Sequence, residues 1–297
     1  MGERTGSFHF SQRRDGDGSF SGDLRSMSEV AASLDAHGPW TTLDSLRLQS
    51  PLVQNITNFV AMDLAANLLL AVGASPAMVQ AREEVEEFVA LADALTINLG
   101  TLTAPLVEAM AGAAREAVAQ GKPWVLDPVG AGTTSLRDDA AKRLVRLQPT
   151  VIRGNGSEIL ALGGGERSHG RGAESTVDSV EALDAAHDLA KRSGSVVAVT
   201  GAIDYVTDGR RMMAVANGHP MMGRVTAVGC ALTCLIGACC AVEPDPLIAT
   251  ADALAILGVA GEIAGADAAG PGSFRVHLID ALYGLDQASL QALARVQ

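Results

Sequence analysis

From Pro51 onward, short apolar runs alternate with amphipathic segments of helical periodicity. The runs have the length of β-strands, and the segments between them are long enough to be crossover helices. This alternation is typical of a parallel sheet covered by helices, because parallel strands need long connections. The sequence therefore predicts a single α/β domain with a central, mostly parallel sheet flanked by helices. We expect strands at 77–79, 94–98, 124–127, 150–153, 196–199 and 205–207, and helices at 28–46, 104–119, 136–147, 180–192, 229–242, 246–266 and 277–285.

The composition and charge of the chain narrow the classes of partner. Hydrophobic residues make up 48% of the sequence and aromatic residues only 3%, which suits small-residue helices packed against a buried parallel sheet. The formal net charge is -12, and no basic stripe is present that could displace the counterions of a phosphate backbone. We therefore expect no nucleic-acid partner and no binding to an anionic membrane surface.

Three features of the sequence predict a cytoplasmic protein. The N-terminal residues include Arg13 and Arg14 but lack the apolar segment of a secretory signal. The longest uncharged apolar run, 225–242, is interrupted by Thr226 and Thr233 and is short for a membrane span. All four cysteines lie in one predicted helix, where disulfide geometry is poor, and this favours a reducing compartment.

Two segments are predicted to lie outside the regular elements. Residues 1–27 are rich in Gly, Ser, Asp and Arg and have little periodicity, so we expect a flexible tail before a folded domain at 28–297. The Gly-rich stretch 163–172 carries Arg167, His169 and Arg171 and lacks a flanking strand-to-helix turn. We expect it to form a mobile surface loop.

Four predicted strands end in polar or Gly-rich corners, at 98–101, 127–132, 153–155 and 200–201. In open α/β sheets, ligands bind at the carboxyl ends of the strands. The four corners therefore predict one shared site at one edge of the sheet.

The run Val225–Cys230 leads directly into the apolar stretch 231–242. Small residues allow successive backbone N–H groups to converge, and the start of a helix adds unpaired donors and the positive end of its dipole. This pattern predicts a cradle for a phosphoryl group, with Cys230 at its mouth, where the dipole favours the thiolate. The alternative is a buried turn of small residues with an inert cysteine. We expect the other three cysteines to be core residues.

Two carboxylates and one guanidinium are candidates for a Mg²⁺-nucleotide site. Asp127 ends a predicted strand and Glu158 lies at the start of a predicted helix, so both are expected to face one crevice. Mg²⁺ binds to few carboxylates, together with water and phosphate, although both acids could equally serve as ordinary caps. Arg153, at the end of an apolar strand, needs an anionic partner, which is either a phosphate or a structural ion pair. The segment Asn55–Asn58 could cap the following helix or hold a polar group of a substrate.

Together these motifs resemble the hydroxyethylthiazole kinase family, a branch of the ribokinase-like superfamily. The resemblance runs from about Pro51 to about Leu285. It rests on the ordered blocks Gln54–Asn58, Gly73–Met78, Leu126–Gly132, Ile152–Asn155, Val199–Gly201, Asn217–His219, Val225–Thr226 with Gly229–Cys230, and Gly270–Phe274. It implies a ribokinase-like fold and phosphorylation of the alcohol of 4-methyl-5-(2-hydroxyethyl)thiazole by ATP with Mg²⁺, a step of thiamine salvage. It also implies a homotrimer with sites at the subunit interfaces.

The resemblance assigns roles to particular residues. Cys230 stands where most members of the superfamily have a catalytic aspartate. The residues implied at the thiazole are Met78, largely through its backbone, Asn58, Asn55 and, through its backbone only, Ala227. Those implied at ATP are Arg153, Thr200, Asn155 and Thr226. Those implied at Mg²⁺ are Asp127 and Glu158.

The chain departs from the family pattern in the cradle. The family usually has Gly-Thr-Gly-Cys or Gly-Ala-Gly-Cys there, whereas Ala227 and Val228 precede Gly229 in this chain. A methyl group at Ala227 is tolerable at a negative φ and strained at a positive one. Three alternatives to a thiazole kinase remain open. The first is a kinase of another small alcohol such as a hydroxymethylpyrimidine, and the second, suggested by Ala227 and Val228, is a nucleotide-binding protein without catalysis. The third is a dinucleotide-dependent oxidoreductase, which the missing G-x-G-x-x-G pattern disfavours.

Overall fold

The computed structural model describes residues 38–164 and 178–297. The predicted tail at 1–27 and most of the predicted loop at 163–172 lie outside the described residues. Only the second half of the helix expected at 28–46 is described, and there α2 spans Pro39–Gln49.

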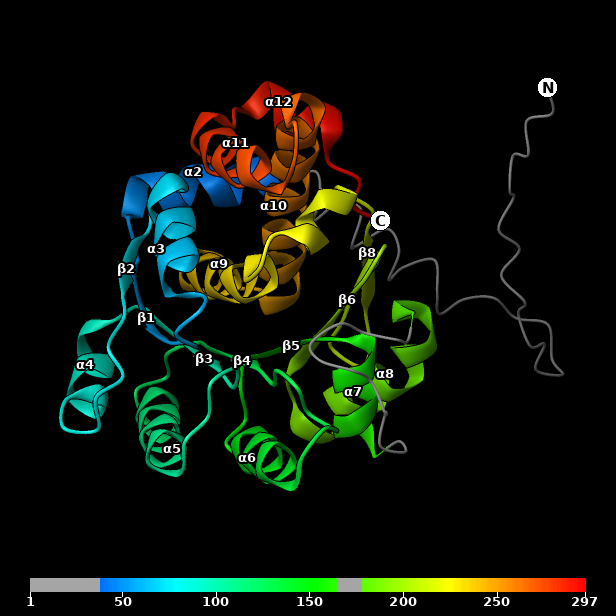
Figure 1. The fold of residues 1–297 in the computed structure, drawn as a ribbon. Coiled ribbons are helices and arrows are strands. Elements are labelled where there is room, and N and C mark those ends of the chain that lie inside the picture. The colour runs from blue at the N-terminus through cyan, green and yellow to red at the C-terminus, as the bar shows by residue number, and fades with distance from the viewer. Residues whose placement is uncertain (1–37, 165–177) are drawn as a thin grey trace, which may run out of the picture. The chain divides into compact units, whose positions relative to one another are not determined.

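One sheet of eight strands forms the centre of the fold, in the order β2-β1-β3-β4-β5-β6-β7-β8 (Figure 1). The pairs from β2 to β6 are parallel, and β7 and β8 are antiparallel. The mostly parallel α/β sheet is thus as predicted. The strands are β1 Leu52–Ile56, β2 Ser75–Ala77, β3 Ala94–Asn98, β4 Trp124–Asp127, β5 Val151–Asn155, β6 Val196–Thr200, β7 Asp204–Thr207 and β8 Met212–Val215.

Helices cover both faces of the sheet (Figure 1). One face carries α4 Val85–Leu91, α5 Ala104–Ala119, α6 Ser135–Val145, α7 Gly156–Gly163 and α8 Leu183–Ser193. The other carries α2, α3 Met62–Ala71, α9 Val228–Val242, α10 Pro246–Asp267, α11 Pro271–Gly284 and α12 Gln287–Leu293. Two short 3₁₀ helices, η1 Ser179–Ala182 and η2 Pro220–Arg224, precede α8 and α9.

Helix α9 packs directly on the middle of the sheet. At Gly237 an added Cβ would lie 2.5 Å from Cγ2 of Thr96 on β3, so only glycine allows this close approach. Among the described residues, α10 is the helix long and apolar enough to cross a membrane, with a mean hydropathy of 1.7, but 89% of that window is buried inside the protein. Its apolar composition therefore reflects its place in the core.

One missed strand contains buried polar residues that break the apolar pattern. Strand β1 was not predicted, because Gln54 and Asn55 interrupt it. Both are fully buried in the structure, and the Gln54 amide donates to the carbonyls of Val79 and Val85. Strand β2 lies two residues before the expected position, at Ser75–Ala77. The elements β8, α4 and α12 were also missed, and α11 begins at Pro271 rather than at 277. Helices α3 and α7 lie where helices were expected without bounds, after Asn58 and around Glu158.

Candidate active site

The carboxyl ends of the parallel strands meet at one edge of the sheet, and α9 begins at the same edge. The predicted strand corners therefore do converge. Side chains from β3, β4, β5, β6, α9 and the turn after β1 contact one another there. They are Asn98, Asp127, Arg153, Thr200, Cys230 and Asn58.

Arg153 lies at the centre of this edge. Its Nη2 donates to Oγ1 of Thr200 at 2.7 Å, and its Nη1 lies 3.7 Å from Oδ2 of Asp127. An added Cβ at Gly229 would lie 2.9 Å from Nη2, so the first turn of α9 passes too close to the guanidinium for any side chain. The structural ion pair that the sequence left open is therefore present. It still leaves Nε of Arg153 without a partner among the described residues.

A cavity of about 680 Å³ opens beside Arg153 and Thr200. This volume lies within the range of small-ligand sites. Its walls come from the ends of β5 and β6, from η2 and from the first turn of α9. The lining includes Gly201, Asp204, Asn217, His219, Val228, Gly229 and Leu257. Two of the residues expected at ATP, Arg153 and Thr200, thus line this cavity.

The cradle residues form the start of α9. Ala227 is the N-cap, with φ 70° and ψ 2°, which is the left-handed region that favours glycine. Ala227 therefore has the positive φ at which its methyl group is strained. Thr226 precedes the cap and is exposed. The first N–H groups of an α-helix have no partner within the helix, so the start of α9 presents donors at this edge.

Asp127 is fully buried at the end of β4. Its Oδ2 accepts hydrogen bonds from Nδ2 of Asn98 at 2.6 Å and from Oγ1 of Thr233 at 2.8 Å. Its Oδ1 has no hydrogen-bond partner in the part of the chain that the structure describes. Burial raises the pKa of this carboxyl, and the nearby charge of Arg153 opposes that shift.

Glu158 is held by two backbone groups. Its Oε1 accepts from the N–H of Gly130 and its Oε2 from the N–H of Asn155, both at 2.9 Å. The Asn155 side chain in turn accepts from the N–H of Glu158, which completes a capping box at the start of α7. Burial, followed by the charge of Asp127, raises the pKa of Glu158 to about 7.

The two acids fit a Mg²⁺ ion. Each is buried and the charge of Asp127 raises the pKa of Glu158, so a divalent cation would offset the repulsion between them. The unpartnered Oδ1 of Asp127 is an oxygen of the type that Mg²⁺ binds. No group of three or more His, Cys, Asp or Glu able to hold a metal occurs within 38–164 and 178–297.

Cys230 lies on the first turn of α9, where its Sγ accepts a hydrogen bond from Nδ2 of Asn58 at 3.3 Å. Burial, followed by the charge of Asp127, raises the pKa of the thiol to about 11. The expectation that the helix dipole favours the thiolate is therefore wrong, because desolvation and a neighbouring carboxylate outweigh it. Cys234 is a buried core residue, as predicted, and burial raises its pKa to about 12.

The residues expected at the thiazole are only partly brought together. Asn58 contacts Cys230 and also caps the turn before α3, since its Oδ1 accepts from the N–H groups of Val60 and Ala61. Asn55 is fully buried within the sheet, where it donates to the carbonyl of Val53 and accepts from Thr96. The structure does not join Asn55 to the Asn58–Cys230 pair. Met78 directly follows β2 and is half-buried.

Two functional candidates were missed in the sequence. Asn98 and Thr233 both donate to Asp127. Asn98 ends a predicted strand with a polar residue, and Thr233 is a polar residue in an apolar helix one turn after Gly229. A polar residue at each of these positions could have indicated a functional role, but the position does not show which side chain the residue contacts.

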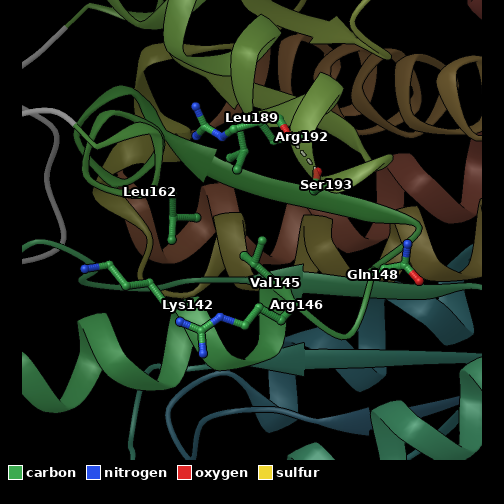
Figure 2. A pocket seen from close by; sticks show the side chains of 8 residues that line it. All are labelled: Lys142, Val145, Arg146, Gln148, Leu162, Leu189, Arg192 and Ser193. Carbon is green, nitrogen blue, oxygen red and sulfur yellow. Dashed lines mark hydrogen bonds between the residues drawn. The ribbon is translucent and has the colours of Figure 1, made fainter.

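A second cavity, of about 380 Å³, lies between α6, α7 and α8 and carries Lys142, Arg146 and Arg192 (Figure 2). The C-terminal ends of the three helices lie around it, at Val145, Gly163 and Ser193. Arg192 donates to the carbonyl of Gly163. The positive side chains thus compensate the negative ends of helix dipoles. This cavity lies at the edge opposite to the strand corners and is not part of the candidate site.

The chain is similar to known proteins over most of its length. The model of the Hydroxyethylthiazole kinase family matches residues 43–288. A hydroxyethylthiazole kinase of Cereibacter sphaeroides is 56% identical over 260 residues, which cover 88% of this chain and 98% of the relative. One of Granulibacter bethesdensis is 54% identical over 253 residues, covering 85% of this chain and 92% of the relative.

Solved structures agree with these relatives. The structure of a hydroxyethylthiazole kinase protein from Pyrococcus horikoshii matches with a TM-score of 0.80 and 44% identity, over 87% of this chain and 98% of that one. A pyridoxal kinase from Staphylococcus aureus, in complex with AMP-PCP and pyridoxal, matches with a TM-score of 0.55 and 16% identity, over 72% of this chain and 88% of that one. The second match concerns the fold alone, and with the first it confirms the ribokinase-like architecture. The family match, the identities and the shared fold agree: this chain belongs to the hydroxyethylthiazole kinase family.

Proposed function

We propose that this chain transfers the terminal phosphoryl group of ATP to the hydroxyl of 4-methyl-5-(2-hydroxyethyl)thiazole, as a step of thiamine salvage. The family membership supports the reaction. The observation that carries the proposal is the meeting of Arg153, Asp127 and Cys230 at the first turn of α9. A cation, a carboxylate and a group able to contact an alcohol thus lie together, and the cation, Arg153, lines the cavity.

We infer that the nucleotide occupies the cavity beside Arg153 and Thr200. The guanidinium offers several donors in a planar fork, which matches the oxygens of a phosphate. The free N–H groups at the start of α9 add further donors near Gly229. Asn155 ends β5 and Thr226 lies just before α9, and we infer that both border the phosphates.

We infer that Asp127 and Glu158 hold the Mg²⁺ ion. When bound, the ion neutralises the charge that develops on the phosphoryl oxygens. Asp127 is fixed by two hydrogen bonds from Asn98 and Thr233, and Glu158 by two backbone N–H groups. Both carboxylates are therefore oriented before any ligand arrives, so little reorganisation accompanies binding.

We infer that Cys230 orients the hydroxyl of the acceptor rather than ionising it beforehand. With its pKa near 11, the thiol keeps its proton at neutral pH. Phosphoryl transfer passes through a loose transition state, in which positioning and charge stabilisation matter more than early removal of the proton. A thiol can therefore stand where a carboxylate is usual.

The test is a coupled ADP-release assay with Mg²⁺ and ATP, run with and without the thiazole alcohol and checked by the mass of the product. Thiazole-dependent ADP release with a phosphorylated product is the expected result. Binding of ATP and the thiazole without turnover would instead favour a protein that binds nucleotide without catalysis. Turnover with only a hydroxymethylpyrimidine would identify another small-alcohol kinase.

We further propose that the chain forms a homotrimer with the acceptor site at a subunit interface. Phe59 and Val60, beside Asn58, are 64% and 61% exposed. Large apolar side chains next to a polar site are typical of a surface that a partner subunit covers. The mass of the protein in solution, from light scattering, tests this, and a monomer would contradict it.

We propose a cytoplasmic location for the reaction. All four cysteines are free in the structure, as expected in a reducing compartment.

A further inference from the structure

Asn98 connects the two halves of the candidate site. Its Nδ2 donates to Oδ2 of Asp127 at 2.6 Å. Its Oδ1 accepts from Nδ2 of Asn58 at 2.8 Å and from the N–H of Gly100 at 2.8 Å. Asn98 is only 3% exposed, and its hydrogen bonds with Asp127 and Asn58 are buried, whereas the bond from Gly100 is partly buried.

The orientation of both amides follows from these partners. Asp127 accepts from Asn98, so the oxygen of Asn98 must face Asn58. The oxygen of Asn58 already accepts from Val60 and Ala61, so its nitrogen must face Cys230. A flip of either amide would place two acceptors or two donors together.

The backbone keeps this arrangement in place. In the register of the sheet Asn98 pairs with Asp127, so both side chains leave the sheet at the same edge. An added Cβ at Gly100 would lie 2.6 Å from Cβ of Asn58, so the chain after β3 packs directly against Asn58. Little room remains for either amide to turn.

We propose that Asn98 is a positioning residue for phosphoryl transfer, whose one amide sets both the carboxylate of Asp127 and, through Asn58, the thiol of Cys230. The inference rests on the proposed function. The sulfur accepts from Asn58, so the proton of the thiol is left for a different partner, and the acceptor hydroxyl can take that place. Asn98 itself touches neither substrate in this role.

The experiment compares Asn98→Ala with the control Thr42→Val, both in the full-length chain. Thr42 also makes one buried side-chain hydrogen bond, to Oδ2 of Asp252 at 2.5 Å, but lies on α2, outside the site. We expect Asn98→Ala to lower kcat about 10- to 100-fold, because small misplacements of reacting groups are costly. The KM of each substrate should change less than about threefold. Thr42→Val should lower the melting temperature and keep kcat.

Two further readouts separate positioning from a structural role. The fold-loss of kcat in the double variant Asn98→Ala with Cys230→Ala should be smaller than the product of the fold-losses of the two single variants, because both substitutions act on the same contact. In a crystal structure of Asn98→Ala, Nδ2 of Asn58 should lie beyond hydrogen-bonding distance of Sγ of Cys230, against 3.3 Å here. If Asn98→Ala does not fold, Asn98→Ser, whose hydroxyl can still accept from Gly100, is measured with the same expectations.

The outcomes are distinct. An unchanged kcat, losses that multiply, or an unchanged contact between Asn58 and Cys230 would each overturn the inference and leave the proposed function intact. A wild-type chain with no thiazole-dependent turnover would overturn the proposed function, and the inference with it.

Discussion

Replacing Ala227 by glycine is expected to stabilise the protein. Ala227 is the N-cap of α9 with φ 70°, where an alanine is strained by about 1–2 kcal/mol. Glycine adopts this conformation freely but loses more backbone entropy on folding, which offsets about 0.4–1 kcal/mol. The net gain therefore lies between about 0 and 1.6 kcal/mol, with a central value of about 0.8 kcal/mol.

A gain of this size is measurable in thermal unfolding. For a domain of about 250 residues, 1 kcal/mol corresponds to about 2 °C, so Ala227→Gly should raise the melting temperature by about 1–2 °C. The control is Ala119→Gly, at the exposed last residue of α5, where φ is not positive. There the same change should lower the melting temperature, because glycine disfavours a helix.

One result would refute the reasoning. If Ala227→Gly melts at or below the temperature of the wild type while Ala119→Gly behaves as expected, the left-handed backbone at Ala227 carries no strain. The KM for ATP should be unchanged in Ala227→Gly, because the backbone donors at the start of α9 keep their positions.

Three more predictions concern the site and the core. Cys230→Ala should lower kcat without abolishing turnover, and Cys230→Asp should retain or raise activity, because a carboxylate is the better base; a folded, ATP-binding Cys230→Asp variant without turnover would contradict this. Arg153→Ala should raise the KM for ATP at least about tenfold in steady-state assays, since a hydrogen bond to a charged group is lost, and an unchanged KM would remove Arg153 from the nucleotide site. Burial raises the pKa of Asp252 from 3.8 to about 7, so the folded state binds more protons between these values and the free energy of unfolding falls as the pH rises through them. Asp252→Asn should remove this dependence, so the difference in melting temperature between the variant and the wild type should shift in favour of the variant from about pH 5 to about pH 8. If the two melting temperatures change with pH in parallel, Asp252 is ionised throughout this range.

Much of the fold could be predicted from the sequence because its central elements are regular. The strands Ala94–Asn98 and Trp124–Asp127 and the helix Ala104–Ala119 lie where they were expected. The strands could be located because they are continuous apolar runs between turn residues, as expected where both faces of a central parallel strand are buried. Strand β1 could not be predicted in the same way, because the amide nitrogen of its buried Gln54 donates to carbonyl groups 25 and 31 residues away in the chain.

The candidate site, like the fold, could be predicted from the sequence only in part. The sequence by itself determined which residue types stand at the strand ends, such as Asp127 and Arg153, and at the start of the following apolar helix, where Cys230 lies. It also predicted their meeting, because the carboxyl ends of parallel strands lie at one edge. Only the tertiary structure decided the burial that raises the pKa of the Cys230 thiol, the positive φ of Ala227 and the bridge through Asn98. The physical reason is that burial, backbone torsion and hydrogen-bond partners depend on which segments pack together, and a linear pattern records none of these.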